Sequence, residues 1–93
     1  MSRFDLGATV VTRGVADLLD ESTSFAKDLQ KALYRYIDCD WGDMTQEDKE
    51  ANDHAVTFGD DRIFAAYELP ETRVWIITEW DRSVTTILLP EEY

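Results

Sequence analysis

The spacing of apolar residues divides the chain into a helical first half and an alternating second half. Between residues 25 and 37 the apolar side chains recur every three or four positions, which places them on one face of a helix. These residues are Phe25, Leu29, Ala32, Leu33, Tyr36 and Ile37. Because Ser22, Thr23 or Ser24 can cap the helix start, the pattern predicts an amphipathic helix over residues 23–37.

Three weaker patterns flank this helix, two before it and one after it. The β-branched run from residue 8 to Val11 predicts a short strand or an extended arm, and residues 15–20 could form one or two helical turns. After the helix, Thr45 stands where an N-cap is expected, which predicts a further helix over about residues 45–57. That helix has few apolar residues, so we expect it on the surface, held by a few contacts.

After Gly59 the period changes to alternation. Three runs rich in β-branched and aromatic residues read as strands, over residues 62–69, 73–80 and 84–89. The connections at residues 70–72 and 81–83 are so short that neighbouring strands should be antiparallel. The predicted fold class is α+β, with N-terminal helices packed on a C-terminal three-stranded antiparallel meander. We expect a single domain, 1–93, with about 8–58 mainly helical and 62–89 forming the sheet.

Composition adds a strong acidic bias to this picture. The 93 residues are 44% hydrophobic, as in globular proteins, but 20 acids oppose 9 bases for a net charge of −11. Such a protein is repelled by nucleic acid and anionic lipid and attracted to basic surfaces, which are often nucleic-acid-binding faces of other proteins. The simpler alternative is that negative charge keeps a small protein soluble.

The N-terminal sequence, the length of the apolar runs and the cysteine content bear on where in the cell the protein is located. The N-terminus (Met1-Ser2-Arg3-Phe4-Asp5) lacks the basic and apolar regions of a signal peptide, and no apolar run is long enough to span a membrane. The single Cys39 rules out an internal disulfide and fits a reducing compartment. We therefore expect a cytoplasmic protein.

The acidic residues concentrate in one stretch. Residues 38–53 hold seven carboxylates and one lysine. Those at the front of the predicted helix favour its start through the helix dipole, but the later ones have no such reason to be acidic. A row formed by Glu47, Glu50 and Asp53 could sit in a groove shaped for DNA and contact its Lys and Arg side chains.

Trp41 lies within this stretch and is either an exposed interface anchor or a plug over the end of a small core. Asp60 and Asp61 extend the patch if their loop folds alongside. The candidate partner-binding residues are therefore Asp38, Asp40, Trp41, Asp43, Glu47, Asp48, Glu50, Asp53, Asp60 and Asp61.

Other chemistries fit poorly. A calcium loop starting at Asp38 would place Gly42 and Asp43 at the wrong positions and Lys49 where a glutamate is needed. His54 and Cys39 fall on separate predicted elements, and neighbouring acids should keep the Cys39 thiol protonated. A carboxylate pair such as Glu79 and Asp81 lacks a recognisable pocket. We therefore expect neither enzymatic activity nor a metal or cofactor, and acids outnumber bases too strongly for direct nucleic-acid binding.

Several segments together resemble a known family. They are Gly42-Asp43 after Trp41, Glu47-Asp48-Lys49 with Asn52-Asp53, Trp75-Ile76-Ile77-Thr78-Glu79, Asp81-Arg82-Ser83, and Thr86-Ile87-Leu88-Leu89-Pro90-Glu91-Glu92-Tyr93. Over about residues 8–93 the chain is similar to small acidic proteins spread on bacterial mobile elements and chromosomes, a family that includes a type I-C anti-CRISPR DNA mimic. Trp80 departs from the small residue expected before Asp81-Arg82-Ser83, and residues 26–38 diverge from the family. A changed exposed face could serve a specialised partner.

The resemblance implies a function that the residue pattern alone does not. It implies an anti-CRISPR inhibitor that binds the basic DNA-binding surface of a type I-C surveillance complex and blocks target DNA. The partner would be a CRISPR-Cas effector subunit. The alternative is a general acidic protein–protein interaction module of a mobile element, in which the carboxylates merely solvate one face.

Overall fold

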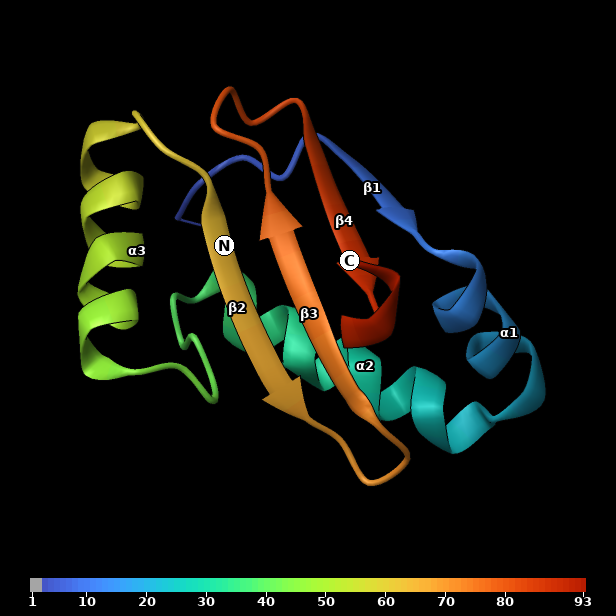
Figure 1. Cartoon of the computed structure of the whole chain (residues 1–93). Helices are drawn as coiled ribbons and strands as arrows, with labels where there is room; N and C mark the ends of the chain where they lie inside the picture. The colour runs from blue at the N-terminus through green and yellow to red at the C-terminus, as the bar shows by residue number, and fades with distance from the viewer. Residues whose placement is uncertain (1–2) are drawn as a thin grey trace.

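A computed structural model describes residues 3–93, so Met1 and Ser2, which begin the segment predicted not to be a signal peptide, lie outside the described residues. Three helices and a four-stranded sheet form one mixed α+β arrangement (Figure 1). In chain order the elements are β1 (Ala8–Val11), α1 (Arg13–Glu21), α2 (Thr23–Ile37), α3 (Gln46–Phe58), β2 (Ile63–Glu68), β3 (Arg73–Thr78), β4 (Val84–Leu88) and the 3-10 helix η1 (Pro90–Glu92). The predicted α+β class is confirmed.

The sheet has the strand order β1-β4-β3-β2. Strands β2, β3 and β4 form the predicted antiparallel meander, and the N-terminal run is a strand that pairs in parallel with β4. Helix α1 begins at Arg13, two residues earlier than the predicted turns. Its start is stabilised from far along the chain, because the Gly14 N–H and the Thr12 hydroxyl both donate to the Glu92 carboxylate.

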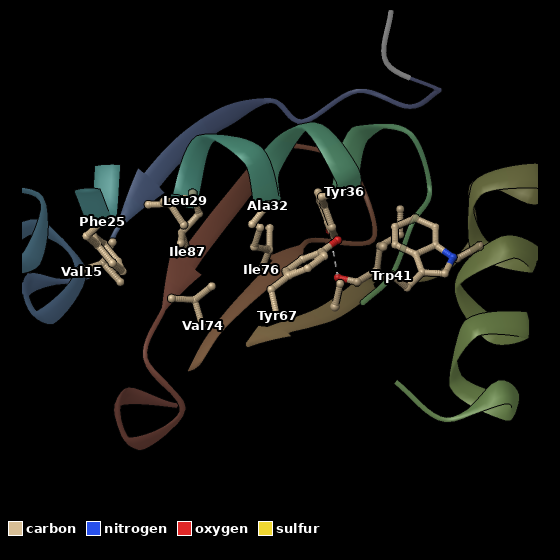
Figure 2. Packing of buried hydrophobic residues seen from close by; sticks show 13 residues of the cluster. Val15, Phe25, Leu29, Ala32, Tyr36, Trp41, Tyr67, Val74, Ile76 and Ile87 are labelled. Carbon is tan, nitrogen blue, oxygen red and sulfur yellow. Dashed lines mark hydrogen bonds between the residues drawn. The ribbon is translucent and has the colours of Figure 1, made fainter. Parts of the chain in front are cut away.

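Helix α2 covers one face of the sheet and supplies most of the helical side of the core (Figure 1). It starts where the sequence suggested, since the Ser22 hydroxyl accepts from the Phe25 N–H at 3.0 Å. Figure 2 shows its apolar side chains meeting those of the strands in a single row. The predicted helical pattern is thus explained by burial, with four of the expected residues fully inside, namely Phe25, Leu29, Ala32 and Tyr36.

A line of hydroxyl groups crosses this core. The Thr85 hydroxyl donates to the Leu6 carbonyl oxygen at 2.7 Å, so its proton is used there. Thr78 must then donate to Thr85, and Tyr36 to Thr78, each over 2.7 Å. Within residues 3–93 no buried side-chain polar atom lacks a partner, so these groups are buried at little cost.

Helix α3 lies along the outer edge of β2 rather than across a face of the sheet (Figure 1). Its poverty in apolar residues explains the position, because only Asn52 and Ala55 are buried. The Asn52 amide donates to the Phe64 carbonyl oxygen at 2.7 Å and accepts from the Phe64 N–H at 3.2 Å. One side chain therefore takes the place of a neighbouring strand at this edge.

Candidate interaction surface

The connector between α2 and α3 is held by short, specific contacts. The Arg35 guanidinium binds both carboxylate oxygens of Asp40, at 2.8 and 3.2 Å, and lowers the pKa of that carboxyl. Gly42 forms an isolated parallel bridge to Ala66, and the Asp43 N–H donates to the Ala66 carbonyl oxygen at 2.8 Å. The connector thus continues the cover of the β2 edge that Asn52 begins.

Trp41 is buried, so the prediction of an exposed anchor at this position is wrong. Only 3% of the residue is exposed, and its ring packs 5.6 Å from that of Tyr36. Figure 2 shows the indole at the end of the core with its nitrogen directed toward α3, where it donates to Asp53 at 2.9 Å. The alternative interpretation, a plug over the end of a small core, describes this residue.

Helix α3 is capped at both ends, and its N-cap is the one that the sequence predicted. The Thr45 hydroxyl accepts from the Asp48 N–H at 3.1 Å, with Glu47 and Asp48 in the first turn. Gly59 ends the helix in the left-handed conformation, with φ at 66°. The helix is therefore a defined platform for the side chains on its outer surface.

All nine carboxylates predicted as partner-binding are exposed, and we call them the acidic surface. They are Asp38, Asp40, Asp43, Glu47, Asp48, Glu50, Asp53, Asp60 and Asp61. Within the same span the only Lys or Arg is Lys49.

Part of this charge is compensated within the chain. Asp40 pairs with Arg35 and Asp38 lies 3.5 Å from Arg3, while Asp60 lies 3.8 Å from His54. Within residues 3–93 the other members of the acidic surface form no ion pair, namely Asp43, Glu47, Asp48, Glu50, Asp53 and Asp61. Four of these six carboxylates lie on α3, so the uncompensated charge centres on that helix.

Sequence reasoning did not foresee the role of Arg82. Its guanidinium donates to the carbonyl oxygens of Ala55 at 2.8 Å, Asp61 at 2.6 Å, and Glu79 and Trp80 at 3.1 Å each. It joins the end of α3, the following loop and the β3–β4 turn. The sequence marked this position only as a turn, because the partners lie up to 27 residues away.

The remaining reactive groups are isolated from one another. Burial raises the pKa of the Cys39 thiol, with Asp53 and Asp38 adding to the effect, so the predicted direction is confirmed although burial is the larger cause. Within residues 3–93 no group of three or more His, Cys, Asp or Glu side chains is placed to hold a metal ion. None of the helices in the described part of the chain combines the length and hydropathy that a membrane span requires.

An open groove of about 390 Å³ runs between α3 and the sheet face that α2 does not cover. Asp48, Asn52 and Arg62 line it together with the rings of Phe64 and Trp75. The Asn52 amide is already engaged by the Phe64 backbone. The groove holds neither Cys39 nor His54 and so unites none of the nucleophiles and bases considered above.

Comparison of the chain with models of protein families, with curated proteins and with solved structures finds no match.

Proposed function

We propose that this protein is an inhibitor that occupies a basic DNA-binding surface of another protein and excludes DNA from it. The observation that carries the proposal is the acidic surface, nine exposed carboxylates with a single lysine among them on a connector, helix α3 and the loop that follows it. Its complement is a groove lined by Lys and Arg side chains, which is the chemistry of a DNA-binding site. The family resemblance narrows the target to the DNA-binding channel of a type I-C surveillance complex.

The spacing of the carboxylates supports mimicry of a phosphate row. Glu47, Glu50 and Asp53 follow one another at three-residue intervals, which corresponds to about 4.5 Å along a helix axis per step. Phosphates of one DNA strand advance about 3.4 Å per nucleotide along the duplex axis. Cationic side chains are long and flexible enough to meet either series, so a groove built for phosphates can bind this helix.

The fixed position of α3 strengthens the proposal. Asn52 and Arg82 attach the helix to the sheet, and the Trp41 indole donates to Asp53. A charge row on a rigid support loses less conformational entropy on binding than one on a flexible tail. Long-range attraction should accelerate association, and salt should screen it over about 10 Å at 0.1 M.

A general acidic interaction module is the second candidate. The pairing of Asp38 with Arg3 and of Asp40 with Arg35 favours it, because carboxylates that stabilise the connector need no external partner. Under this alternative the remaining acids on α3 solvate the helix and contribute little to any specific complex.

Charge reversal in matched pairs separates the two candidates. In one variant Glu47→Lys and Glu50→Lys change the free carboxylates of α3. In the control, Asp17→Lys and Asp20→Lys change exposed residues of α1, at the opposite edge of the sheet (Figure 1). Both variants alter the net charge equally, so a general electrostatic effect would weaken both alike.

The assay follows labelled target duplex bound to a purified type I-C surveillance complex as each protein is titrated. The proposal expects stoichiometric loss of DNA binding with the wild type, a loss of inhibition of tenfold or more with the α3 pair, and little change with the α1 pair. Each contact between charged groups that a variant loses contributes about 1 kcal/mol or more to binding, and this loss underlies the expected fold-change. Equal inhibition by both variants would favour the general module, and a wild type that leaves DNA bound at low salt would overturn the proposal for this target.

A further inference from the structure

Two large aromatic side chains are exposed at one end of the molecule. Phe58, the last residue of α3, is 66% exposed, and Trp80, just after β3, is 64% exposed. Their backbones are close in space, because Arg82 binds the carbonyl oxygens of both Trp80 and Ala55. Removing either ring from water by contact with another protein would be favourable. Two such exposed rings close together are therefore typical of a surface that binds a partner.

The same end carries exposed carboxylates. Asp60 and Asp61 follow α3, and Asp81 follows Trp80. The Asp81 carboxylate accepts hydrogen bonds from the Ser83 hydroxyl at 2.6 Å and the Ser83 N–H at 3.1 Å, which lower its pKa, the hydroxyl more than the N–H. We call this set, Phe58, Asp60, Asp61, Trp80 and Asp81, the aromatic end.

We propose that the aromatic end is a binding site for arginine and lysine side chains of a basic partner protein. Each cation would lie over the Trp80 or Phe58 ring and pair with a neighbouring carboxylate. The identity of the partner rests on the proposed function, but the chemistry of the site does not. The site shares Asp60 and Asp61 with the acidic surface and adds Asp81 and two exposed rings to it. These rings supply the aromatic anchor that Trp41, being buried, cannot provide.

The negative charge of the aromatic end favours a cationic ligand over an apolar one. An apolar partner segment would have to cover the carboxylates of Asp60, Asp61 and Asp81, whose desolvation is unfavourable without a counter-charge. A guanidinium satisfies both components at once, because it stacks on rings and binds carboxylates in the same plane. The chain already contains this pairing internally, with Arg35 placed 5.1 Å from the Tyr67 ring centre and bound to Asp40.

The backbone segments that form the aromatic end are held in place before any ligand binds. Arg82 occupies the left-handed region, with φ at 60°, and its guanidinium holds four carbonyl oxygens from three segments. The turn that carries Trp80 and the loop that carries Asp61 are therefore fixed relative to each other. A fixed frame leaves only side-chain rotations to be lost when a cation binds.

The expected contribution follows from cation–π energies. Such a pair contributes about 0.5–1 kcal/mol when exposed and about 2 kcal/mol when desolvated. For one ring this corresponds to a change in affinity of about 2- to 30-fold.

The test uses the full chain and hexa-arginine as the probe, at low salt, with affinity measured by calorimetry. Trp80→Ser and Phe58→Ser remove the two rings together. Tyr34→Ser is the matched control, because Tyr34 is an aromatic residue 59% exposed on α2 and outside the aromatic end. Circular dichroism verifies that each variant keeps its secondary structure.

We expect the double variant to bind hexa-arginine at least fivefold more weakly than wild type, while Tyr34→Ser binds unchanged. In parallel, the indole N–H resonance of Trp80 should shift on titration while that of buried Trp41 stays in place. Equal affinities for all three proteins, or no binding by wild type, would overturn the inference. Ring-dependent binding by a protein that leaves the surveillance complex active would retain this inference and reject the proposed function. Inhibition of the complex by a protein whose affinity for hexa-arginine does not depend on the rings would retain the proposed function and reject this inference.

Discussion

Replacing Asn52 by leucine tests whether one amide side chain holds the acidic helix on the sheet. Asn52 is 5% exposed and exchanges two hydrogen bonds with the backbone of Phe64. Leucine has a similar volume but leaves the Phe64 N–H and carbonyl oxygen without this partner. A lost hydrogen bond lowers stability by about 1 kcal/mol and a buried group left unpaired by about 1–3 kcal/mol. For two half-buried groups we expect the free energy of unfolding to fall by about 2–4 kcal/mol.

Urea unfolding measures this loss. With a slope of about 1.5 kcal/mol per molar urea, in the range for small domains, the transition midpoint should fall by about 1.3–2.7 M. Glu50→Leu is the matched control, since it places the same side chain at an exposed position of the same helix and should change stability by less than about 0.5 kcal/mol. Faster hydrogen exchange at the Phe64 amide would locate the effect. A midpoint for Asn52→Leu equal to that of Glu50→Leu would refute the reasoning.

Two further predictions concern the pH dependence and the backbone. Hydrogen bonds from the Thr12 hydroxyl, and then from backbone N–H groups, lower the pKa of Glu92, so the stability it contributes is present above the unfolded pKa and lost as pH falls through the folded one. Thermal unfolding from about pH 6 to pH 2 should therefore show Glu92→Gln less stable at the upper end and equal to wild type at the lower end; parallel curves would contradict this. Gly42→Ala should lower the free energy of unfolding by more than about 3 kcal/mol, because φ is 72° and the new Cβ would lie 2.2 Å from the Ala66 carbonyl oxygen. At Gly59, φ is 66° but an added Cβ would meet no atom within 4 Å, so Gly59→Ala should lower the free energy of unfolding by about 1 kcal/mol. Equal losses for the two variants in chemical denaturation would show that the close approach of Gly42 to Ala66 is unimportant.

The elements that sequence could predict are those whose signals are local. Side chains of the meander alternate over five or six residues, and the turns between strands are short, so both the strands and their order followed. Helix α2 was equally accessible, because its cap at Ser22 and its apolar stripe lie within the helix itself. The parallel pairing of β1 with β4 joins residues more than 70 positions apart, so the sequence could offer only a strand or an arm.

The candidate site likewise has features that the sequence could predict and features that it could not. Exposure of the carboxylates followed from their number, since so small a core cannot hold them. The burial of Trp41 and the exposure of Trp80 did not follow from the sequence, because they depend on where the connector and the β3–β4 turn meet the rest of the fold. Trp41 turns inward because Gly42 and Asp43 attach the connector to β2, whereas Trp80 lies in a turn that Arg82 holds by its backbone alone.

The hydroxyl line through the core has a consequence for how uniquely the chain can fold. Apolar contacts between α2 and the sheet would tolerate small shifts, since one aliphatic side chain can replace another at little cost. Such a shift would break the hydrogen bonds from Tyr36 through Thr78 and Thr85 to Leu6, because each hydroxyl has one proton to donate and its 2.7 Å acceptor occupies one position. They run in one direction and join a helix, two strands and the N-terminal segment. The hydrogen bonds therefore favour the native register over arrangements in which the same apolar residues are displaced along the sheet.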